Sequence, residues 1–83
     1  MTFTVVWLQS AESELTQLWL DAEDQTLLAS AANDIDRLLR TSPLDVGESR
    51  AQGRRILLVR PLGVSYSIST EDRIVRVLHV WKY

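Results

Sequence analysis

The residues of this sequence best suited to chemistry are arginines gathered in one short segment. Residues 47–55 read GESRAQGRR, so that Arg50, Arg54 and Arg55 lie close together, and Arg60 follows them. Arginine keeps its charge at physiological pH and binds a phosphate through two parallel hydrogen bonds. Glu48, in the same segment, is a candidate base or a partner that orients an arginine. We therefore expect this segment to bind a phosphate group or an acidic partner.

The single histidine supplies a second kind of chemical group. His79 is the one side chain here that titrates near neutrality without help, which makes it the natural general acid or base. It shares the run Ile74–Trp81 with Arg76, which we expect on the face of the run away from the neighbouring valines. The alternative is that a histidine between two apolar neighbours is a partly buried strand residue that hydrogen-bonds the backbone.

Length and composition restrict the class of protein. The 83 residues suffice for one small domain, which we expect to span residues 1–83. The sequence has no cysteine, which excludes disulfides and thiolate metal sites, and we expect neither a metal nor a cofactor. No stretch reads as a signal peptide or as a run of about 18 apolar residues that would span a membrane. These features predict a soluble, cytoplasmic domain with no membrane contact.

Charge is divided unevenly along the chain. Residues 1–36 hold seven acids and no lysine or arginine, whereas residues 37–83 hold nine bases and four acids. Such asymmetry can present a basic face to an anion although the whole chain has a formal charge of -2. The alternative is that the two halves simply attract each other.

Hydrophobic periodicity predicts one strand and two helices in the first half of the chain. Residues 3–7, FTVVW, are β-branched and aromatic, as is typical of a strand. We expect Ser10 to be the N-cap of the first helix and Asp24 the N-cap of the second, and we expect Trp7 and Trp19 in the core. The second helix has the clearest apolar stripe, made of Leu28, Ala31, Ala32, Ile35, Leu38 and Leu39.

Three strands joined by hairpins are expected in the second half. Residues 55–59 form an apolar run, residues 64–68 alternate apolar residues with serines, and residues 74–81 form the last strand. Arg54 and Arg55 would point to opposite faces of a strand, so at most one of them would serve a site. The order strand, helix, helix and three-stranded antiparallel meander predicts an α+β fold, with both helices on one face of a four-stranded sheet.

This order of elements, together with GRRILLV, GVSYSI and EDRIVRVLHVWKY, resembles the RelE/ParE superfamily of toxins from type II toxin–antitoxin pairs. The resemblance covers nearly the whole chain and is most specific in its C-terminal third. It implies a small cytoplasmic protein that a cognate antitoxin neutralises by wrapping an extended or helical segment around it. One branch of the superfamily cleaves messenger RNA in the ribosomal A site, and the other poisons DNA gyrase.

The resemblance also implies site residues near the second strand and at the end of the last one, to which the position of Arg76 adds a further candidate. Metal-independent RNA cleavage needs a base for the 2′-hydroxyl, an acid for the leaving 5′-oxygen and cations for the charge on phosphorus. The sequence departs from the nuclease branch at Gly63 and Val80, where that branch often carries arginine. The candidate catalytic residues are Glu48, Arg50, Arg55, Arg76, His79 and Tyr83.

The leading interpretation is a toxin that inhibits translation by ribosome-dependent, metal-independent cleavage of messenger RNA. Its partners would be the ribosome, messenger RNA and a cognate antitoxin, of which an acidic segment would lie over the basic face. The alternative is a ParE-like inhibitor of DNA gyrase, or a non-catalytic member that only binds its antitoxin.

Overall fold

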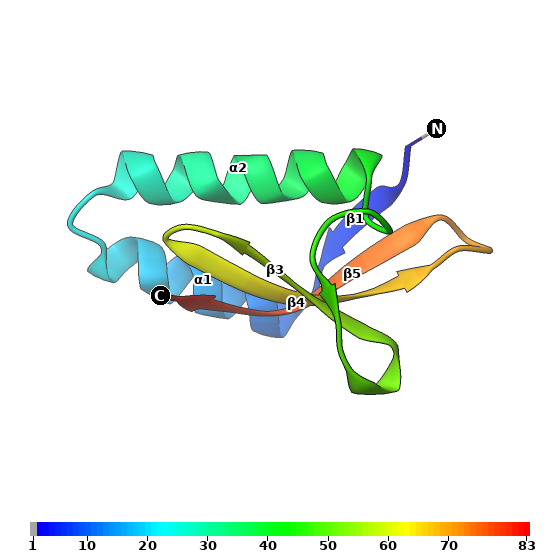
Figure 1. Ribbon diagram of the computed structural model, residues 1–83. Helices are drawn as coiled ribbons and strands as arrows, with labels where there is room; N and C mark the ends of the chain where they lie inside the picture. The colour runs from blue at the N-terminus through cyan, green and yellow to red at the C-terminus, as the bar shows by residue number, and fades with distance from the viewer. Residues whose placement is uncertain (1) are drawn as a thin grey trace.

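The structure, a computed structural model, describes residues 2–83 as a five-stranded sheet with two α-helices (Figure 1). The sheet order is β1-β5-β4-β3-β2, with β1 parallel to β5 and the other neighbours antiparallel. The expected α+β order is confirmed, and the loop before the second expected strand contributes an additional strand of two residues, β2. Across residues 2–83, neither helix is long and apolar enough to cross a membrane. The elements are β1 (Thr4–Trp7), α1 (Gln9–Asp21), α2 (Gln25–Thr41), β2 (Glu48–Ser49), the 3-10 turn η1 (Ala51–Gly53), β3 (Arg54–Val59), β4 (Leu62–Ser69) and β5 (Ile74–Lys82).

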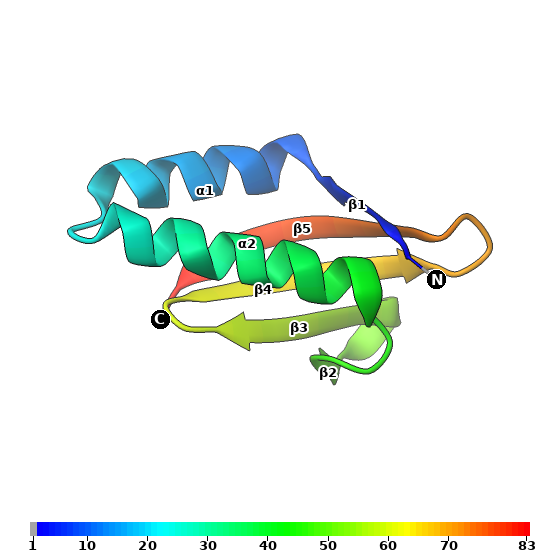
Figure 2. The ribbon, with the colours of Figure 1, turned by 90° about the horizontal axis from the view of Figure 1, so that it is seen from above.

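Helix α2 covers one face of the sheet (Figure 2). Its cap is the predicted one, because the Asp24 side chain accepts a hydrogen bond of 2.9 Å from the backbone N–H of Leu27. Its buried residues belong to the predicted stripe, and they pack with alternate residues of β3, β4 and β5 into the core. The core side chains from these four elements include Leu28, Ala31, Ile35, Leu39, Leu57, Val64, Tyr66, Val75 and Val77.

Helix α1 lies beside the outer edge of β5, where β1 no longer covers it (Figure 2). Strand β1 pairs only with Ile74–Val77, so the rest of β5 would present unpaired backbone groups. The Ser10 hydroxyl donates a hydrogen bond of 3.0 Å to the carbonyl of Leu78, and the N–H of Val80 donates one of 3.3 Å to Glu14. The prediction that Ser10 is the N-cap is therefore wrong: the helix begins at Gln9, and the Ser10 hydroxyl bonds the strand edge instead.

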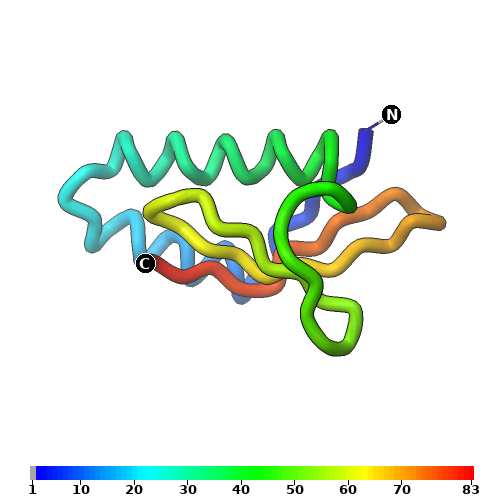
Figure 3. Tube along the Cα trace, viewed as in Figure 1, coloured from blue at the N-terminus to red at the C-terminus, as the bar shows by residue number. Residues whose placement is uncertain are grey.

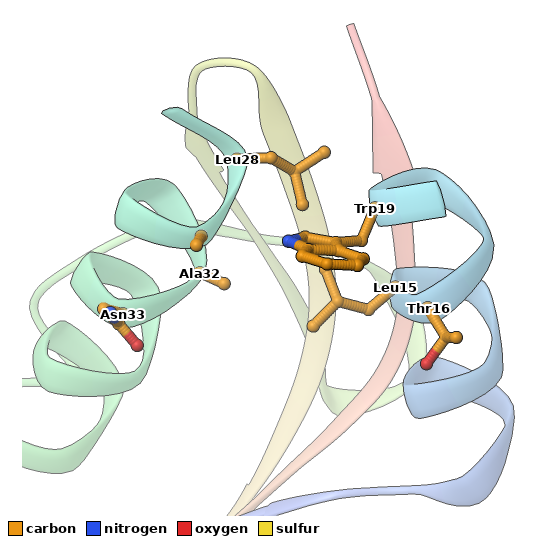
Figure 4. Close-up of a pocket in the computed structure, with 7 residues that line it drawn as sticks. Leu15, Thr16, Trp19, Leu28, Ala32 and Asn33 are labelled. Carbon is orange, nitrogen blue, oxygen red and sulfur yellow. The ribbon is translucent and has the colours of Figure 1, made fainter. Parts of the chain in front are cut away.

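The prediction for Trp19 is also wrong, because this side chain is 41% exposed. It lies across the gap between α1 and α2, beside Leu15 and Leu28 (Figure 4). The gap is a pocket of about 290 Å³ whose lining is mostly apolar and includes no titratable side chain. Trp7, by contrast, is half-buried, and its indole N–H donates a hydrogen bond of 3.3 Å to Asp36 on α2.

The face of the sheet opposite α2, which we call the open face, carries the residues of β3–β5 that alternate with the core. A β-bulge at Leu78 controls which residues of β5 belong to it, because Ser65 pairs with His79 while the next residue of β4 pairs with Val77. The extra residue allows both Val77 and Val80 to be buried on the helix side. As a consequence Arg76 and His79, three positions apart, both lie on the open face.

The segment between α2 and β3 passes the outer edge of the sheet and ends on the side away from α2 (Figure 3). It includes β2, which pairs with β3 at only two positions, Glu48 with Ile56 and Ser49 with Arg55. The arginine-rich segment identified in the sequence therefore consists of the edge strand β2, the turn that follows it and the first residues of β3.

Candidate functional site

Two arginines flank one serine on the open face. Arg54 pairs with Ser67 across β3 and β4, and Ser67 pairs with Arg76 across β4 and β5. Since neighbouring strands lie about 4.8 Å apart, the two arginine Cα atoms are separated by about 10 Å, and both side chains are long enough to meet above Ser67. Within residues 2–83 neither guanidinium group has a carboxylate within 4.0 Å. The pair forms a cationic position that a phosphate would fit.

His79 occupies the neighbouring row of the same face. It pairs with Ser65, two residues along β4 from Ser67, which puts the two rows about 7 Å apart. The imidazole side chain is 57% exposed, and its Nδ1 lies 3.3 Å from Oε1 of Glu14. The alternative of a partly buried histidine bonded to the backbone does not describe this residue. The structure thus brings His79 together with Arg76, and with Arg54 beyond it.

Glu48 and Arg50 form an ion pair of 3.0 Å with each other at the outer edge of the sheet. Their side chains are 75% and 49% exposed, so the pair contributes under about 1 kcal/mol. Glu48 belongs to the cross-strand row of His79, but the two are three strands, or about 14 Å, apart. Both residues border a hollow of about 290 Å³ beside β3, and the structure does not bring them to His79.

Arg55 points to the opposite side of the sheet from Arg54 and holds the loop that precedes β2. Its Nη2 donates hydrogen bonds to the carbonyls of Val46 at 2.9 Å and of Leu44 and Gly47 at 3.3 Å. Its Nε donates to the hydroxyl of Tyr66 at 3.3 Å. The guanidinium group is therefore occupied by backbone oxygens, and Arg54 is the member of the Arg54-Arg55 pair that lies on the open face with Arg76.

Tyr66 completes this anchor, which we call the loop latch and define as Arg55, Tyr66 and Gly47. The buried Tyr66 hydroxyl lies 3.0 Å from the carbonyl oxygen of Pro43 and 2.9 Å from that of Val46, and its single proton is shared between these two acceptors. Burial raises the pKa of Tyr66 above its ordinary value of 10.0, and the adjacent Arg55 partly opposes that rise. Gly47 has a φ of 73°, and a Cβ there would lie 2.8 Å from the Tyr66 hydroxyl, so this approach requires glycine.

Tyr83 lies at the far end of β5 from Arg76. Its ring packs under the guanidinium group of Arg60, 4.5 Å from the ring centroid, and its N–H donates a hydrogen bond of 3.0 Å to Pro61. Four residues of extended chain separate it from His79, a distance of about 13 Å. The structure therefore places Tyr83 outside the cluster of Arg54, Arg76 and His79.

Trp81 lies on the open face between His79 and Tyr83 and rests on Gly63. A Cβ at Gly63 would come within 2.6 Å of the Trp81 indole, so a larger residue there must displace the ring. We expect Gly63→Ala to lower the free energy of unfolding by about 1–3 kcal/mol, measured by urea denaturation. Ser65→Ala, on the same strand and face, is the matched control. Equal stability of the two variants would contradict the packing of Trp81 on Gly63.

The sequence does not single out two residues of this face, Arg54 and Glu14. The run RILLV is apolar on both faces and gives no sign of which of Arg54 and Arg55 faces the core. Glu14 has no local signal at all, because its contact with His79 joins positions 65 residues apart. It depends on the parallel pairing of β1 with β5, which places α1 beside β5.

This chain has relatives among solved structures. No protein-family model and no curated protein sequence matches the chain. Among solved structures, the toxin–antitoxin complex RelBE2 of Mycobacterium tuberculosis superposes with a TM-score of 0.83 at 23% identity, covering 100% of this chain and 93% of that one. A free RelE toxin of E. coli with two arginines mutated to alanine superposes with a TM-score of 0.73 at 16% identity, covering 99% of this chain and 84% of that one. The ParDE system of P. aeruginosa superposes with a TM-score of 0.68 at 16% identity, covering 96% of this chain and 95% of that one. These three neighbours are structures of RelE/ParE toxins or of their toxin–antitoxin systems, and they align over nearly the full length of this chain, so its fold is the RelE/ParE toxin fold.

Proposed function

We propose that this protein is the toxin of a type II toxin–antitoxin pair and inhibits translation by ribosome-dependent, metal-independent cleavage of messenger RNA. The observation that carries the proposal is the cluster of Arg54, Arg76 and His79 on an open sheet face. Two guanidinium groups that have no carboxylate partner among residues 2–83 suit a phosphodiester, and an exposed imidazole beside them suits proton transfer. The RelE/ParE fold makes RNA the first substrate to test.

The chemistry proposed for the cluster is an internal displacement at phosphorus. Arg54 and Arg76 would hold the non-bridging oxygens, which carry more negative charge in the transition state. A ring nitrogen of His79 accepts the proton of the 2′-hydroxyl as the 2′-oxygen forms its bond to phosphorus. The bond from phosphorus to the 5′-oxygen breaks, that oxygen takes a proton from water, and His79 later releases its own proton to water. The products are a 2′,3′-cyclic phosphate and a 5′-hydroxyl.

Inhibition of DNA gyrase is a second candidate, favoured by the overlap with the ParDE system over 96% of this chain. Two further findings agree with a toxin that binds without cleaving. Glu48 and Arg50 neutralise each other, and the guanidinium group of Arg55 is bound to backbone carbonyls. A gyrase supercoiling assay with purified protein tests this candidate directly.

The proposed partner is a cognate antitoxin, because the neighbour from M. tuberculosis was solved as a toxin–antitoxin complex. An acidic segment would neutralise Arg54 and Arg76 on the open face. An apolar side chain of the same antitoxin would fit the pocket beside Trp19, which is 41% exposed in this chain alone. Replacing Trp19 with alanine would then weaken the complex, whereas it would leave RNA cleavage by the free toxin unchanged.

The deciding experiment is incubation of the purified protein with programmed ribosomes, with and without EDTA, followed by primer extension. New 5′ ends in the ribosomal A site that persist in EDTA support the proposal. Intact messenger RNA together with loss of DNA supercoiling supports the gyrase candidate instead.

A binding prediction isolates the two arginines. Each phosphate neutralised on a single strand contributes about 0.7 to the slope of log K against log salt. Because Arg54 and Arg76 share one phosphate, the Arg54→Ala/Arg76→Ala double variant should lower the slope by about 0.7. The measurement is fluorescence anisotropy with a labelled RNA oligonucleotide at several salt concentrations. Arg37→Ala is the control, because Arg37 lies on α2 with a side chain 69% exposed. A slope unchanged from wild type would contradict the proposed phosphate site.

A further inference from the structure

We propose that Glu14 is a positioning residue for His79, which fixes the proton on Nδ1 and leaves Nε2 free to act as the base. The consequence for catalysis rests on the proposed function, whereas the control of the histidine tautomer does not. The observation is that one carboxylate oxygen, Oε1 of Glu14, lies 3.3 Å from Nδ1 of His79 and also accepts the N–H of Val80 at 3.3 Å.

Helix α1 is bonded to β5 on both sides of His79. The Val80 N–H belongs to the residue next to His79, so the strand itself fixes the oxygen that faces the ring. One helical turn earlier, the Ser10 hydroxyl donates a hydrogen bond of 3.0 Å to Leu78, on the other side of the histidine. These bonds place Glu14 beside the ring of His79.

The acceptor decides which ring nitrogen carries the proton. An ionised carboxylate offers only acceptor sites, so a neutral imidazole facing it is stabilised with hydrogen on Nδ1. The lone pair is then on Nε2, which is the state required of a base. A carboxylate that holds a histidine in its productive tautomer is a recurring device in proton-transfer sites. Glu48 cannot do this here, because it lies three strands away and binds Arg50.

The surroundings of His79 offer few groups that could replace Glu14 as the acceptor for Nδ1. Its 57% exposure leaves the ring open to a substrate, and Glu14 contacts the ring only at Nδ1. The neighbours on the open face, Arg76 and Ser65, include no second carboxylate. Among residues 2–83 no other carboxylate is within 4.0 Å of the ring nitrogens.

The test reads the tautomer directly, because the chain contains a single histidine. The ¹⁵N chemical shifts of the two ring nitrogens are measured by NMR, above the pH at which His79 is protonated. Wild type should show a protonated Nδ1 and a bare Nε2. Glu14→Ala should shift the ring toward the tautomer mixture of a histidine in an unstructured peptide. Glu14→Gln, which keeps an acceptor oxygen, should retain the wild-type tautomer.

Glu12→Ala is the matched control, since Glu12 is exposed on the same helix and has no contact with the ring. It should leave the shifts of His79 unchanged. Thermal unfolding of each variant shows whether loss of the bond to Val80 has unfolded the chain, and the shifts are compared only between folded proteins. A folded Glu14→Ala variant with the wild-type tautomer would overturn the proposal.

The effect on activity follows from the tautomer. Glu14→Ala should lower kcat for RNA cleavage about tenfold with KM little changed, because the ring then presents an N–H where a base is needed. Glu14→Gln should recover most of the loss. Unchanged kcat in Glu14→Ala would overturn the catalytic part of the proposal. A tautomer that depends on Glu14 in a wild-type protein that cleaves no RNA would refute the proposed function and leave the positioning role supported.

Discussion

Replacing His79 with alanine is expected to lower ribosome-dependent RNA cleavage by about 10²–10⁴-fold, the usual contribution of a general acid or base. The reason is that the exposed imidazole of His79 shares the open face with Arg54 and Arg76 and can accept a proton on a ring nitrogen. Both arginines stay protonated and can stabilise charge, but they cannot accept the proton of the 2′-hydroxyl. The measurement is the rate of cleavage of a ribosome-bound message by primer extension.

The matched control for His79→Ala is Arg37→Ala, an exposed substitution on α2 that should leave the rate unchanged. His79→Gln adds a second comparison, because it keeps a polar side chain in a similar volume and still removes the base. Binding of RNA should stay close to wild type in both histidine variants, since the phosphate contacts are assigned to the arginines. Cleavage at the wild-type rate by a folded His79→Ala protein would contradict the assignment of the base.

Local periodicity explains why most elements could be predicted. The stripe of Leu28, Ile35 and Leu39 has helical spacing, and the serines alternating with Val64 and Tyr66 mark a strand with one polar face. Both patterns depend on neighbours a few positions away, and both are borne out. The cap at Asp24 is equally local, since its side chain bonds an N–H three residues on.

The arrangement of the candidate site depends on features that periodicity does not reveal. A strict two-residue alternation puts positions 76 and 79 on opposite faces, and only the bulge at Leu78 brings Arg76 and His79 together. The contact of Glu14 with His79 requires the pairing of β1 with β5, which closes only in the folded chain. The role of Arg55 likewise depends on a loop whose carbonyls turn toward the helix side of the sheet.

Replacing Tyr66 with phenylalanine is expected to lower the free energy of unfolding by about 1–3 kcal/mol at pH 7. The ring keeps its place in the core, but the carbonyls of Pro43 and Val46 lose a buried donor and Arg55 loses an acceptor. A domain of this size has a total stability of only about 5–15 kcal/mol, so the loss is a large fraction. Urea denaturation followed by circular dichroism measures it.

The Tyr66 hydroxyl should also make the free energy of unfolding depend on pH, with a definite sign. The pKa of Tyr66 is raised above 10.0 in the folded protein, so below that pH the group is protonated in both states and contributes no slope. Above it the unfolded chain releases the proton while the folded protein keeps it, and stability falls by up to about 1.4 kcal/mol per pH unit until the folded pKa is passed. The stability difference between wild type and Tyr66→Phe should therefore narrow as the pH rises above 10.0.

Tyr83→Phe is the control for this prediction, because Tyr83 is 40% exposed and its contact with Arg60 is made by the ring. Its stability should follow that of wild type at every pH. A Tyr66→Phe variant as stable as wild type at pH 7 would mean that the loop preceding β2 does not depend on the latch. If the stability difference between wild type and Tyr66→Phe stayed constant from pH 8 to pH 11, the hydroxyl would release its proton equally in the folded and unfolded states. That result would contradict the burial of the hydroxyl between two carbonyls and a guanidinium group.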